Sequence, residues 1–453
     1  MADDLGWMDL ACQGNKLVET PNIDRLARQG MRFTSAYAAA PVCSPTRAAV
    51  LTGQAPARVH MTSHLPGQFF PRDNRPQPAD MVPAIGPEHI TIAERLKEAG
   101  YANAFLGKWH IAPSAGPQGK VAPGHSPLGQ GFDINIGGTS YGGPPSFFSP
   151  YRNATLPDGE PGEYLPDRLV DEAIGFIRDH KARPWMVHLW FYTVHWPMEA
   201  PEKFVAKYQD RPKKGYNHKV YPAMIEAMDL AIARVLGELD KLEIANETFV
   251  VFTSDNGPYG GVGDARPLRA DKGHLYEGGI RIPLIVRWPG GGIEPQSTNE
   301  QLICLTDLFA TVAEIVGVPV PAGSCEDSVS FLPALRGKQI VSTRAGVIHH
   351  SSSGAFAYRE GNWKMILASG SAGWTKPVRL AGGPKAQLYD LAVDAGEANN
   401  RYQSEAEVAM RLLAQFERDV KSGRSTKGPA SKNDAPIVLW KESAGKKRKK
   451  KVK

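Results

Sequence analysis

The stretch TFVVFTSDNG, at residues 248–257, places a buried strand directly before an acidic and an amide side chain. An uninterrupted apolar run rich in Val and Phe is typical of a strand that is covered on both faces of its sheet. A long helical pattern at Tyr221–Leu242 precedes this run, and the same order of helix and strand recurs along the chain. The alternation predicts an α/β fold with a large, mainly parallel sheet flanked by helices.

The same patterns predict the neighbouring elements. We expect strands at Tyr101–Leu106, Trp185–Thr193 and Ile282–Arg287 and helices at Ile23–Gly30, Ile90–Gly100, Leu169–His180 and Thr306–Val316. Thr91 and Glu94 have the spacing of a capping box, which supports a helix start there.

Beyond about residue 340 the sequence changes to short strand patterns separated by turns. These patterns cover Ala345–His349, Ala355–Glu360, Trp363–Ala368 and Gln387–Tyr389, and a helical pattern follows at Val408–Val420. They predict a smaller C-terminal antiparallel sheet with one helix packed on it. We therefore expect a large domain at residues 1–340, a small α+β subdomain at 341–425 and a basic, disordered tail at 426–453.

The net charge of +6 comes from the C-terminal end of the chain. Residues 446–453 carry seven positive charges, and without them the remaining chain has a net charge of −1. A run of this kind is typical of a solvated tail, although it could also bind nucleic acid, an anionic polymer or a membrane surface. We expect no nucleic-acid partner for the nearly neutral body, and no membrane span, because no apolar stretch reaches about 18 residues.

Two pairs of adjacent residues are candidates for binding a cation. Asp255 and Asn256 follow the buried strand, and their oxygens are hard ligands suited to Ca²⁺ or Mg²⁺. An Asx turn before Gly257 is the alternative for this pair. Asp3 and Asp4 are adjacent carboxylates, which repel each other unless a cation neutralises them. Such pairs are also common at helix N-termini.

Cys43 directly precedes a helical run at Ala48–Leu51 and is therefore predicted to lie at a helix N-terminus. This location favours anions and lowers the pKa of a thiol, whereas a buried, inert cysteine is the alternative. The chain contains no Cys-x-x-Cys pair or Cys/His cluster, so we expect no thiolate zinc site. A disulfide between Cys304 and Cys325 is left open.

Several basic residues lie just after predicted strands. Lys108 and His110 follow the strand at residues 101–106, His195 follows the strand at 185–193, and Lys272 lies beyond the strand at 248–253. Each alone would be interpreted as a surface group, but together they predict a converging anion site. The histidines without such a placement are expected to be structural or at the surface: His64, His125, His274, His349 and His350.

Taken together, these residues resemble the sulfatase family, the formylglycine-dependent, arylsulfatase-like enzymes of the alkaline phosphatase superfamily. The segment CSPTR at residues 43–47 has the family's C-x-P-x-R pattern. Further segments are similar to family motifs: DDLGW at 3–7, TPNIDRLA at 20–27, GKWH at 107–110, SDNG at 254–257, Lys272 with EGGIR at 277–281, and LYDL at 388–391. The resemblance extends over residues 1 to about 400, in family order.

The resemblance implies a sulfuric ester hydrolase acting on carbohydrate or aryl sulfates. It implies that a maturation enzyme oxidises Cys43 to formylglycine (3-oxoalanine), whose geminal diol attacks sulfur and later eliminates sulfate. It also implies one Ca²⁺ ion, with Mg²⁺ as the weaker alternative, held by these residues: Asp3, Asp4, modified Cys43, Asp255 and Asn256.

The remaining polar residues receive catalytic roles by the same resemblance. Arg47 would hold the diol, and His110 would hydrogen-bond it and assist the elimination. Lys108, His195 and Lys272 would bind the sulfate oxygens. Either His195 or Lys272 would protonate the leaving oxygen, and the sequence does not decide between them.

Two other functions fit the same motifs. The first is a phosphonate or phosphate monoester hydrolase of the same superfamily. The second is a catalytically inactive protein that binds sulfated glycans. Loops at Phe69–Pro87 and Thr139–Pro161 are expected to shape the pocket, and their aromatic residues could stack on a substrate ring or serve only packing.

The start of the chain departs from the family pattern. Family members have a signal peptide and an apolar strand before the Asp-Asp pair, whereas only Met1 and Ala2 precede it here. The first, central strand is therefore expected to be missing from the chain as given, either because the start is truncated or because the protein lacks this strand. The second case would remove backbone support from Asp3 and Asp4, and we favour the first. A truncated start would be consistent with a periplasmic or secreted protein, although the chain as given shows no signal peptide.

Overall fold

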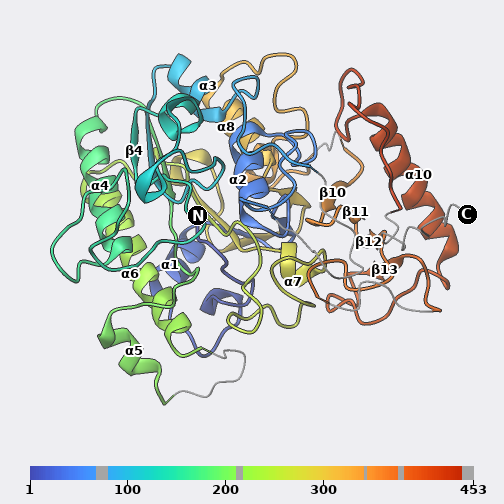
Figure 1. Ribbon diagram of the computed structural model, residues 1–453, viewed down its shortest axis with the longest axis horizontal. Helices are drawn as coiled ribbons and strands as arrows, with labels where there is room; N and C mark the ends of the chain where they lie inside the picture. The colour runs from blue at the N-terminus through green and yellow to red at the C-terminus, as the bar shows by residue number, and fades with distance from the viewer. Residues whose placement is uncertain (68–79, 211–217, 341–343, 376–381, 441–453) are drawn as a thin grey trace, which may run out of the picture.

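The structure is a computed structural model that describes residues 1–67, 80–210, 218–340, 344–375 and 382–440. A large α/β part contains most of the chain, and a small antiparallel sheet with one long helix lies at its side (Figure 1). The predicted fold class is confirmed. The predicted 69–87 loop and the basic 446–453 segment lie wholly or largely outside the described residues.

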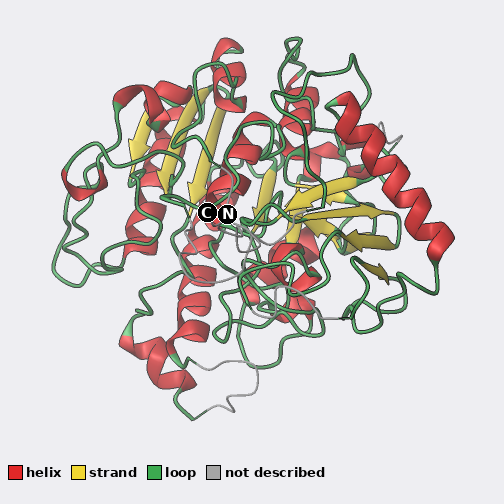
Figure 2. Cartoon of the chain, turned by 45° about the vertical axis from the view of Figure 1, so that its right-hand side comes forward, coloured by secondary structure: helices red, strands yellow, loops and turns green. Residues whose placement is uncertain are grey.

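The α/β part contains three sheets, which are shown as yellow strands in Figure 2. A parallel sheet has the order β4 (Ile134–Ile136), β3 (Ala102–Gly107), β5 (Trp185–Trp190). A mixed sheet has the order β6 (Val250–Thr253), β7 (Leu284–Arg287), β1 (Met31–Phe33), β8 (Ser297–Asn299). In the mixed sheet β7 runs antiparallel to both of its neighbours, and a short parallel pair joins β2 (Ala36–Tyr37) to β9 (Ile303–Cys304).

Helices cover both faces of the parallel sheet, as the alternation of side chains along β3 shows. Ala104 and Leu106 belong to one hydrophobic core, whereas Phe105 between them belongs to another. The first core contains side chains of α1 (Pro21–Gln29), α4 (Leu165–His180) and α6 (Val220–Lys241). The second contains side chains of α2 (Cys43–Thr52) and α3 (Ile92–Glu98), and α8 (Asp307–Val316) packs against both of these helices.

The N-terminal residues lie between the ends of β5 and β6. Residues 191 and 194, just beyond β5, donate backbone hydrogen bonds to Met1 and Asp3 at 3.0 and 2.7 Å, and Asp3 donates back to Thr193 at 2.9 Å. On the other side Ala2 donates to the carbonyl of Thr253 at 2.8 Å. The segment that leads into the acidic pair therefore has backbone support, because the ends of both neighbouring strands hold it.

Most predicted helices and strands are present with shifted ends. The capping box is confirmed, because Thr91 Oγ1 accepts from the backbone of Glu94 at 3.2 Å and the Glu94 carboxylate accepts from Thr91 at 2.7 Å. The sequence did not predict the strands of two or three residues (β1, β2, β4, β8 and β9), nor α5 (Glu202–Tyr208). Such short strands carry too little hydrophobic periodicity to be recognised.

The C-terminal antiparallel sheet is confirmed. Its order is β10 (Val347–His350), β11 (Phe356–Glu360), β12 (Trp363–Ile366), β13 (Gln387–Asp390). Helix α10 (Ala406–Ser422) covers one face of this sheet, where Phe416 stacks on Tyr358 at 5.6 Å. Residues 424–440 follow without helix or strand, and Asn433 hydrogen-bonds the carbonyl of Val420 near the end of α10.

A buried ionic cluster joins the C-terminal sheet to the α/β part. Glu277, the first residue of α7 (Glu277–Ile280), lies 2.9 Å from the Lys364 ammonium group of β12 and accepts from Tyr37 of β2 at 2.6 Å. Glu397 lies 2.9 Å from the same ammonium group and accepts from the backbone of Glu277 at 2.6 Å. Since one lysine serves two carboxylates, this contact fixes the sheet against α7 and the loop before it.

All four cysteines are free thiols, so the disulfide left open between Cys304 and Cys325 is absent. Among the described residues no helix is both long enough and apolar enough to cross a bilayer.

Candidate active site

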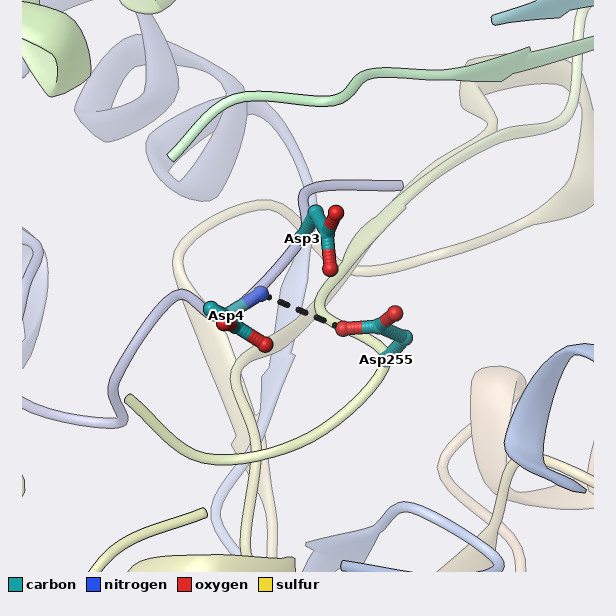
Figure 3. A group of neighbouring side chains, drawn as sticks. All are labelled: Asp3, Asp4 and Asp255. Atoms are coloured by element: carbon teal, nitrogen blue, oxygen red, sulfur yellow. Dashed lines mark hydrogen bonds between the residues drawn. The ribbon is translucent and has the colours of Figure 1, made fainter. Parts of the chain in front are cut away.

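Three buried carboxylates meet at the junction of the N-terminal segment and β6 (Figure 3). One oxygen from each of Asp3, Asp4 and Asp255 lies within 4.8 Å of the others. Asp4 has a left-handed backbone (φ 59°), and its N–H donates to Asp255 Oδ1 at 3.2 Å. This contact turns both carboxylates toward one point, although the two residues are far apart in the sequence.

The carboxylate cluster fits a hard cation. Asn256 donates its amide N–H to Asp4 Oδ1 at 2.8 Å, which places the amide beside the three carboxylates. Asn256 Oδ1 and Asp3 Oδ1 are buried and accept no hydrogen bond from the described residues. Buried acceptors without donors are rare and costly. An oxygen-only set of this kind is what Ca²⁺ or Mg²⁺ selects.

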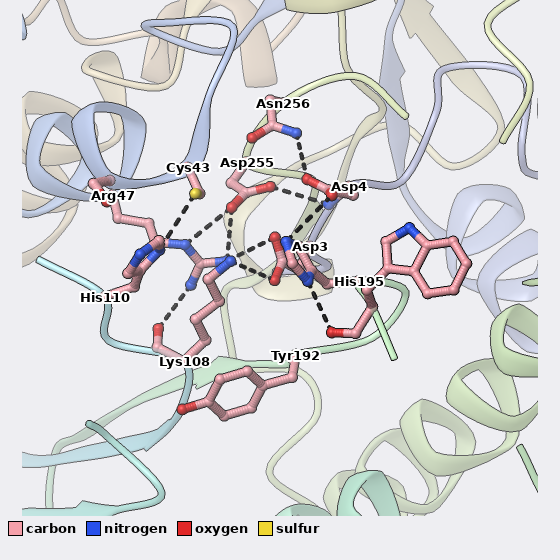
Figure 4. A network of polar contacts seen from close by, with 12 residues as sticks. Asp3, Asp4, Cys43, Arg47, Lys108, His110, Tyr192, His195, Asp255 and Asn256 are labelled. Atoms are coloured by element: carbon pink, nitrogen blue, oxygen red, sulfur yellow. Dashed lines mark hydrogen bonds and ion pairs between the residues drawn. The ribbon is translucent and has the colours of Figure 1, made fainter. Parts of the chain in front are cut away.

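Three basic side chains contact the carboxylates, and two of them, Arg47 and Lys108, are labelled in Figure 4. Arg47 donates from Nε and Nη2 to Asp255 Oδ2 at 2.9 and 2.7 Å. Lys108 lies 2.6 Å from Asp3, and Lys272 lies 2.7 Å from Asp4. Burial opposes the charge of Lys272, but the neighbouring acidic groups, Asp4 foremost, together outweigh it and raise the pKa of this lysine.

Cys43 is the first residue of α2, and His110 lies directly against it. The two side chains are 3.3 Å apart, from Sγ to Nδ1, and both are buried. His110 Nε2 lies 2.9 Å from the carbonyl of Leu65, so this nitrogen carries the hydrogen and Nδ1 is the acceptor. Burial lowers the pKa of His110 well below its usual value, which keeps the imidazole neutral. The imidazole therefore offers a lone pair to whatever group residue 43 carries.

The spacing of Cys43 and Arg47 follows from the helix that both residues occupy. Residues four apart lie on the same helix face, so both side chains point toward the carboxylates. Two further contacts fix the buried guanidinium of Arg47. It donates to the carbonyl of Lys108 at 2.7 Å, and it lies over the Trp190 ring.

His195 lies on the opposite side of Asp4 from Asn256 in Figure 4. Its Nδ1 lies 2.9 Å from the carbonyl of Trp196, and its Nε2 lies 3.7 Å from Asp4 Oδ2. Burial lowers the pKa of His195 to about 3, so the ring is neutral at pH 7 with its hydrogen on Nδ1. The structure thus brings every residue of the predicted metal and anion sites into one place.

The 139–161 loop borders this site through two glycines. A Cβ atom at Gly142 would lie 2.9 Å from His110, and one at Gly143 would lie 2.8 Å from His195. The absence of side chains therefore lets the loop pack against both imidazoles. The aromatic residues of the loop serve mainly packing: Phe147 and Tyr151 are buried, and Phe148 packs on Tyr164 at 5.1 Å.

Comparison with known proteins shows to which family the chain belongs. Residues 1–318 match the sulfatase family, which is well over half of the chain. The chain belongs to the sulfatase family. The members of this family are sulfuric ester hydrolases of the alkaline phosphatase superfamily.

Relatives of this sulfatase match along most of their length. The chain is 31% identical to steryl-sulfatase of Mus musculus, covering 97% of this chain and 84% of that protein. It is 29% identical to N-acetylgalactosamine-6-O-sulfatase of Bacteroides thetaiotaomicron, covering 91% and 90%. A solved structure from glycosaminoglycan metabolism in Bacteroides thetaiotaomicron superimposes with a TM-score of 0.73 at 28% identity, covering 92% of this chain and 97% of that one.

The fold alone extends beyond sulfatases. Phosphonate monoester hydrolase of Agrobacterium radiobacter superimposes with a TM-score of 0.62 at 19% identity, covering 93% of this chain and 94% of that one. This likeness shows a shared architecture, and the choice of ester therefore depends on the site itself.

The sequence did not predict that His64 lies at this site. The prediction of a structural or surface role rested on the lack of a preceding strand. In the structure the next residue, Leu65, accepts from His110 and donates its N–H to Ser44 Oγ at 3.0 Å. His64 is therefore fixed beside the start of α2, and its imidazole interacts electrostatically with Lys272. No local pattern signals this placement, because it depends on a loop that folds back onto α2.

Proposed function

We propose that this protein hydrolyses sulfate esters with a formylglycine made from Cys43 and one bound Ca²⁺ ion. The observation that carries the proposal is the position of Cys43. It begins a helix, lies 3.3 Å from the acceptor nitrogen of His110, and belongs to the same helix face as Arg47, which binds the carboxylate cluster. A free thiol alone gives no reason for this set of neighbours.

The cation would be held by Asp3, Asp4, Asp255 and Asn256, with the modified side chain of residue 43 as a further ligand. The buried oxygens of Asp3 and Asn256 that accept no hydrogen bond support this assignment. Ca²⁺ is preferred over Mg²⁺, because Mg²⁺ usually keeps several waters whereas this set comes entirely from the protein. When bound, the ion acts as a Lewis acid for sulfate oxygens, and the aldehyde hydrate at residue 43 supplies the nucleophilic oxygen.

The chain's own residues then have definite tasks. His110 Nδ1 accepts a proton from the group at residue 43, since its other nitrogen is occupied by the Leu65 carbonyl. Arg47 fixes the position of the Asp255 carboxylate through two hydrogen bonds. Lys108 and Lys272 provide positive charge for the sulfate oxygens. The proton donor to the leaving oxygen is His195 or Lys272.

The charge balance supports an anionic substrate. Three acidic side chains face three basic ones, Arg47, Lys108 and Lys272, so acidic and basic groups are equal in number. A divalent cation would leave an excess of two positive charges in a buried site. Such an excess favours a sulfate ester on entry and even more the doubly charged sulfate that forms.

The names of the relatives support a substrate class. Two of them are a steryl-sulfatase and an N-acetylgalactosamine-6-O-sulfatase. We propose carbohydrate or aryl sulfates as the substrates and a formylglycine-generating maturation enzyme as the partner that converts Cys43.

The decisive comparison uses matched esters of one alcohol. The chain would be produced together with a maturation enzyme, conversion of Cys43 would be confirmed by peptide mass spectrometry, and kcat/KM would be measured on 4-nitrophenyl sulfate and 4-nitrophenyl phosphate. We expect the sulfate to react at least about a hundredfold faster, a difference of about 2.7 kcal/mol in transition-state binding. A preference for the phosphate would favour the phosphonate or phosphate hydrolase. Binding of sulfated glycans without sulfate release would favour an inactive binder.

A further inference from the structure

His64 lies at the edge of the site, but the reaction described above does not use it. Its ring is partly exposed, and its electrostatic neighbours are Lys272, His110 and Lys108. The backbone beside it is fixed by two contacts, from Leu65 to Ser44 and from His110 to Leu65. Because Ser44 follows Cys43, His64 is held at a defined place beside the reacting position.

The hydrogen-bonding state of His64 identifies what it can bind. Its Nδ1 is buried and has no hydrogen-bond partner among the described residues. Burial and the neighbouring cations lower the pKa of His64 to about 4, so the ring is neutral at pH 7. A neutral ring carries one hydrogen, and leaving a buried N–H unpaired costs more than leaving a bare lone pair. The hydrogen therefore belongs on Nε2, and this nitrogen can donate a hydrogen bond to an oxygen of a bound molecule.

Trp374 lies against His64 and comes from the loop between β12 and β13. The two rings are 5.7 Å apart in an edge-to-face arrangement. The indole also covers Gly273, where a Cβ atom would approach the ring to 2.3 Å. Since Gly273 follows Lys272, the indole packs directly beside a residue of the anion site.

The loop that carries Trp374 is fastened to the Lys272 loop. Leu275 donates its N–H to the carbonyl of Ala372 at 3.2 Å. His274 Nε2 lies 2.9 Å from Thr375 Oγ1, and Tyr276 donates to the carbonyl of Gly370 at 2.9 Å. Three consecutive residues, 274–276, therefore each bind the loop on which Trp374 lies, so the position of the indole is fixed by the fold.

We infer that His64 and Trp374 form the subsite for the alcohol part of the ester, and that this subsite takes a hydroxyl-bearing pyranose ring. The inference rests on the proposed function and names its substrate class. His64 donates from Nε2 to a ring or hydroxyl oxygen beside the sulfate. Trp374 gives the ring an apolar wall, as indoles do for the C–H faces of sugars.

The polar character of the surroundings favours a saccharide over a steroid. Polar or small residues at or beside the anion site, among the described residues, include His64, His195, Lys272 and the two glycines at 142 and 143, and the Trp374 indole lies beside His64. A steroid skeleton would leave the His64 donor without an acceptor in a desolvated contact. Sites that hydrogen-bond a substrate oxygen reject analogues that lack it by large factors.

The test compares two substrates in each variant. Wild type, His64→Ala and Trp374→Ala, each with converted residue 43, would be assayed on a panel of sulfated monosaccharides that includes N-acetylgalactosamine 6-sulfate, and on 4-nitrophenyl sulfate. We expect the ratio of kcat/KM for the best sugar to kcat/KM for the aryl ester to fall about tenfold in both variants, mainly through KM. His64→Gln, which keeps an N–H donor, should restore the ratio to within about threefold of wild type.

His60→Ala is the matched control, because His60 lies four residues earlier on the surface with half of its side chain exposed. It should leave the ratio unchanged. An unchanged ratio in His64→Ala or Trp374→Ala, an equal loss on both substrates, or a wild type that cleaves the aryl ester but no sulfated sugar would each overturn the inference. If the wild type releases sulfate from no ester at all, the proposed function itself fails.

Discussion

The Sγ atom of Cys43 lies 3.3 Å from Nδ1 of His110, and the carbonyl of Leu65 occupies the other imidazole nitrogen. The histidine is therefore oriented as a proton acceptor for residue 43. The histidine can act in this way only if the group at residue 43 carries a proton that it gives up during the reaction.

Replacing Cys43 tests the nucleophile. Cys43→Ala should abolish steady-state sulfate release while the fold and calcium binding persist, because no oxygen nucleophile can form. Cys43→Ser should allow at most one covalent turnover, since a serine ester has no second hydroxyl to expel sulfate. Sulfate release, intact-protein mass and a calcium titration measure these outcomes. Cys12→Ser is the matched control, because Cys12 lies away from the site beside Asp24. Normal turnover in Cys43→Ala would refute the assignment.

Asp255→Asn tests the cation site. A ligand at a hundred times its Kd stabilises the native state by about 2.7 kcal/mol, so calcium should raise the denaturation midpoint of the wild type. The variant removes one carboxylate and should lose most of this calcium-dependent shift, measured against a chelator. Asp240→Asn, at the exposed end of α6, should keep the full shift. An equal calcium response in both variants would contradict the assignment.

Lys272→Ala tests the anion site. Removing one positive group that faces the transferring sulfate should lower kcat/KM for an aryl sulfate by about a hundredfold to a thousandfold. Lys241→Ala is the control, since Lys241 is exposed at the end of α6. Unfolding measured in parallel separates catalysis from the loss of the buried partner of Asp4. A loss below about tenfold in a folded variant would remove Lys272 from the catalytic set.

Glu397 should make the stability of the contact between the C-terminal sheet and the α/β part depend on pH. Burial raises its pKa to about 7, above the ordinary value of 4.5, despite the nearby Lys364 ammonium group. A raised carboxyl pKa means that the folded state binds the proton more tightly than the unfolded state. The stabilisation is complete below pH 4.5 and is lost as the pH rises to 7. Between pH 5 and 8 the midpoint of urea unfolding should therefore fall less in Glu397→Gln than in wild type, and equal falls would contradict this.

The convergence of these residues could be predicted from the sequence because they lie in fixed positions relative to regular elements. Cys43 and Arg47 share a helix, Asp255 and Asn256 follow β6, and Lys108 directly follows β3. Strand ends meet at one edge of a sheet, so side chains placed there converge even when they are distant in sequence.

The sequence failed where contacts join irregular segments. His64 and Trp374 lie on two loops that meet only because the C-terminal sheet packs against the α/β part. No periodic pattern in the sequence predicts this contact. The pairing of the N-terminal segment could not be predicted for a related reason. Ala2 and Asp3 are too few to form a recognisable strand, yet the ends of β5 and β6 supply hydrogen bonds on both sides.

The most direct test of the account compares two forms of the same chain, one with Cys43 fully converted to formylglycine and one with the free thiol, at equal calcium concentration. The measurement is the rate of sulfate release from 4-nitrophenyl sulfate. We expect steady turnover from the converted form and none from the thiol form. Equal rates from both forms, or no release by a fully converted, calcium-bound protein from any sulfate ester, would contradict the account.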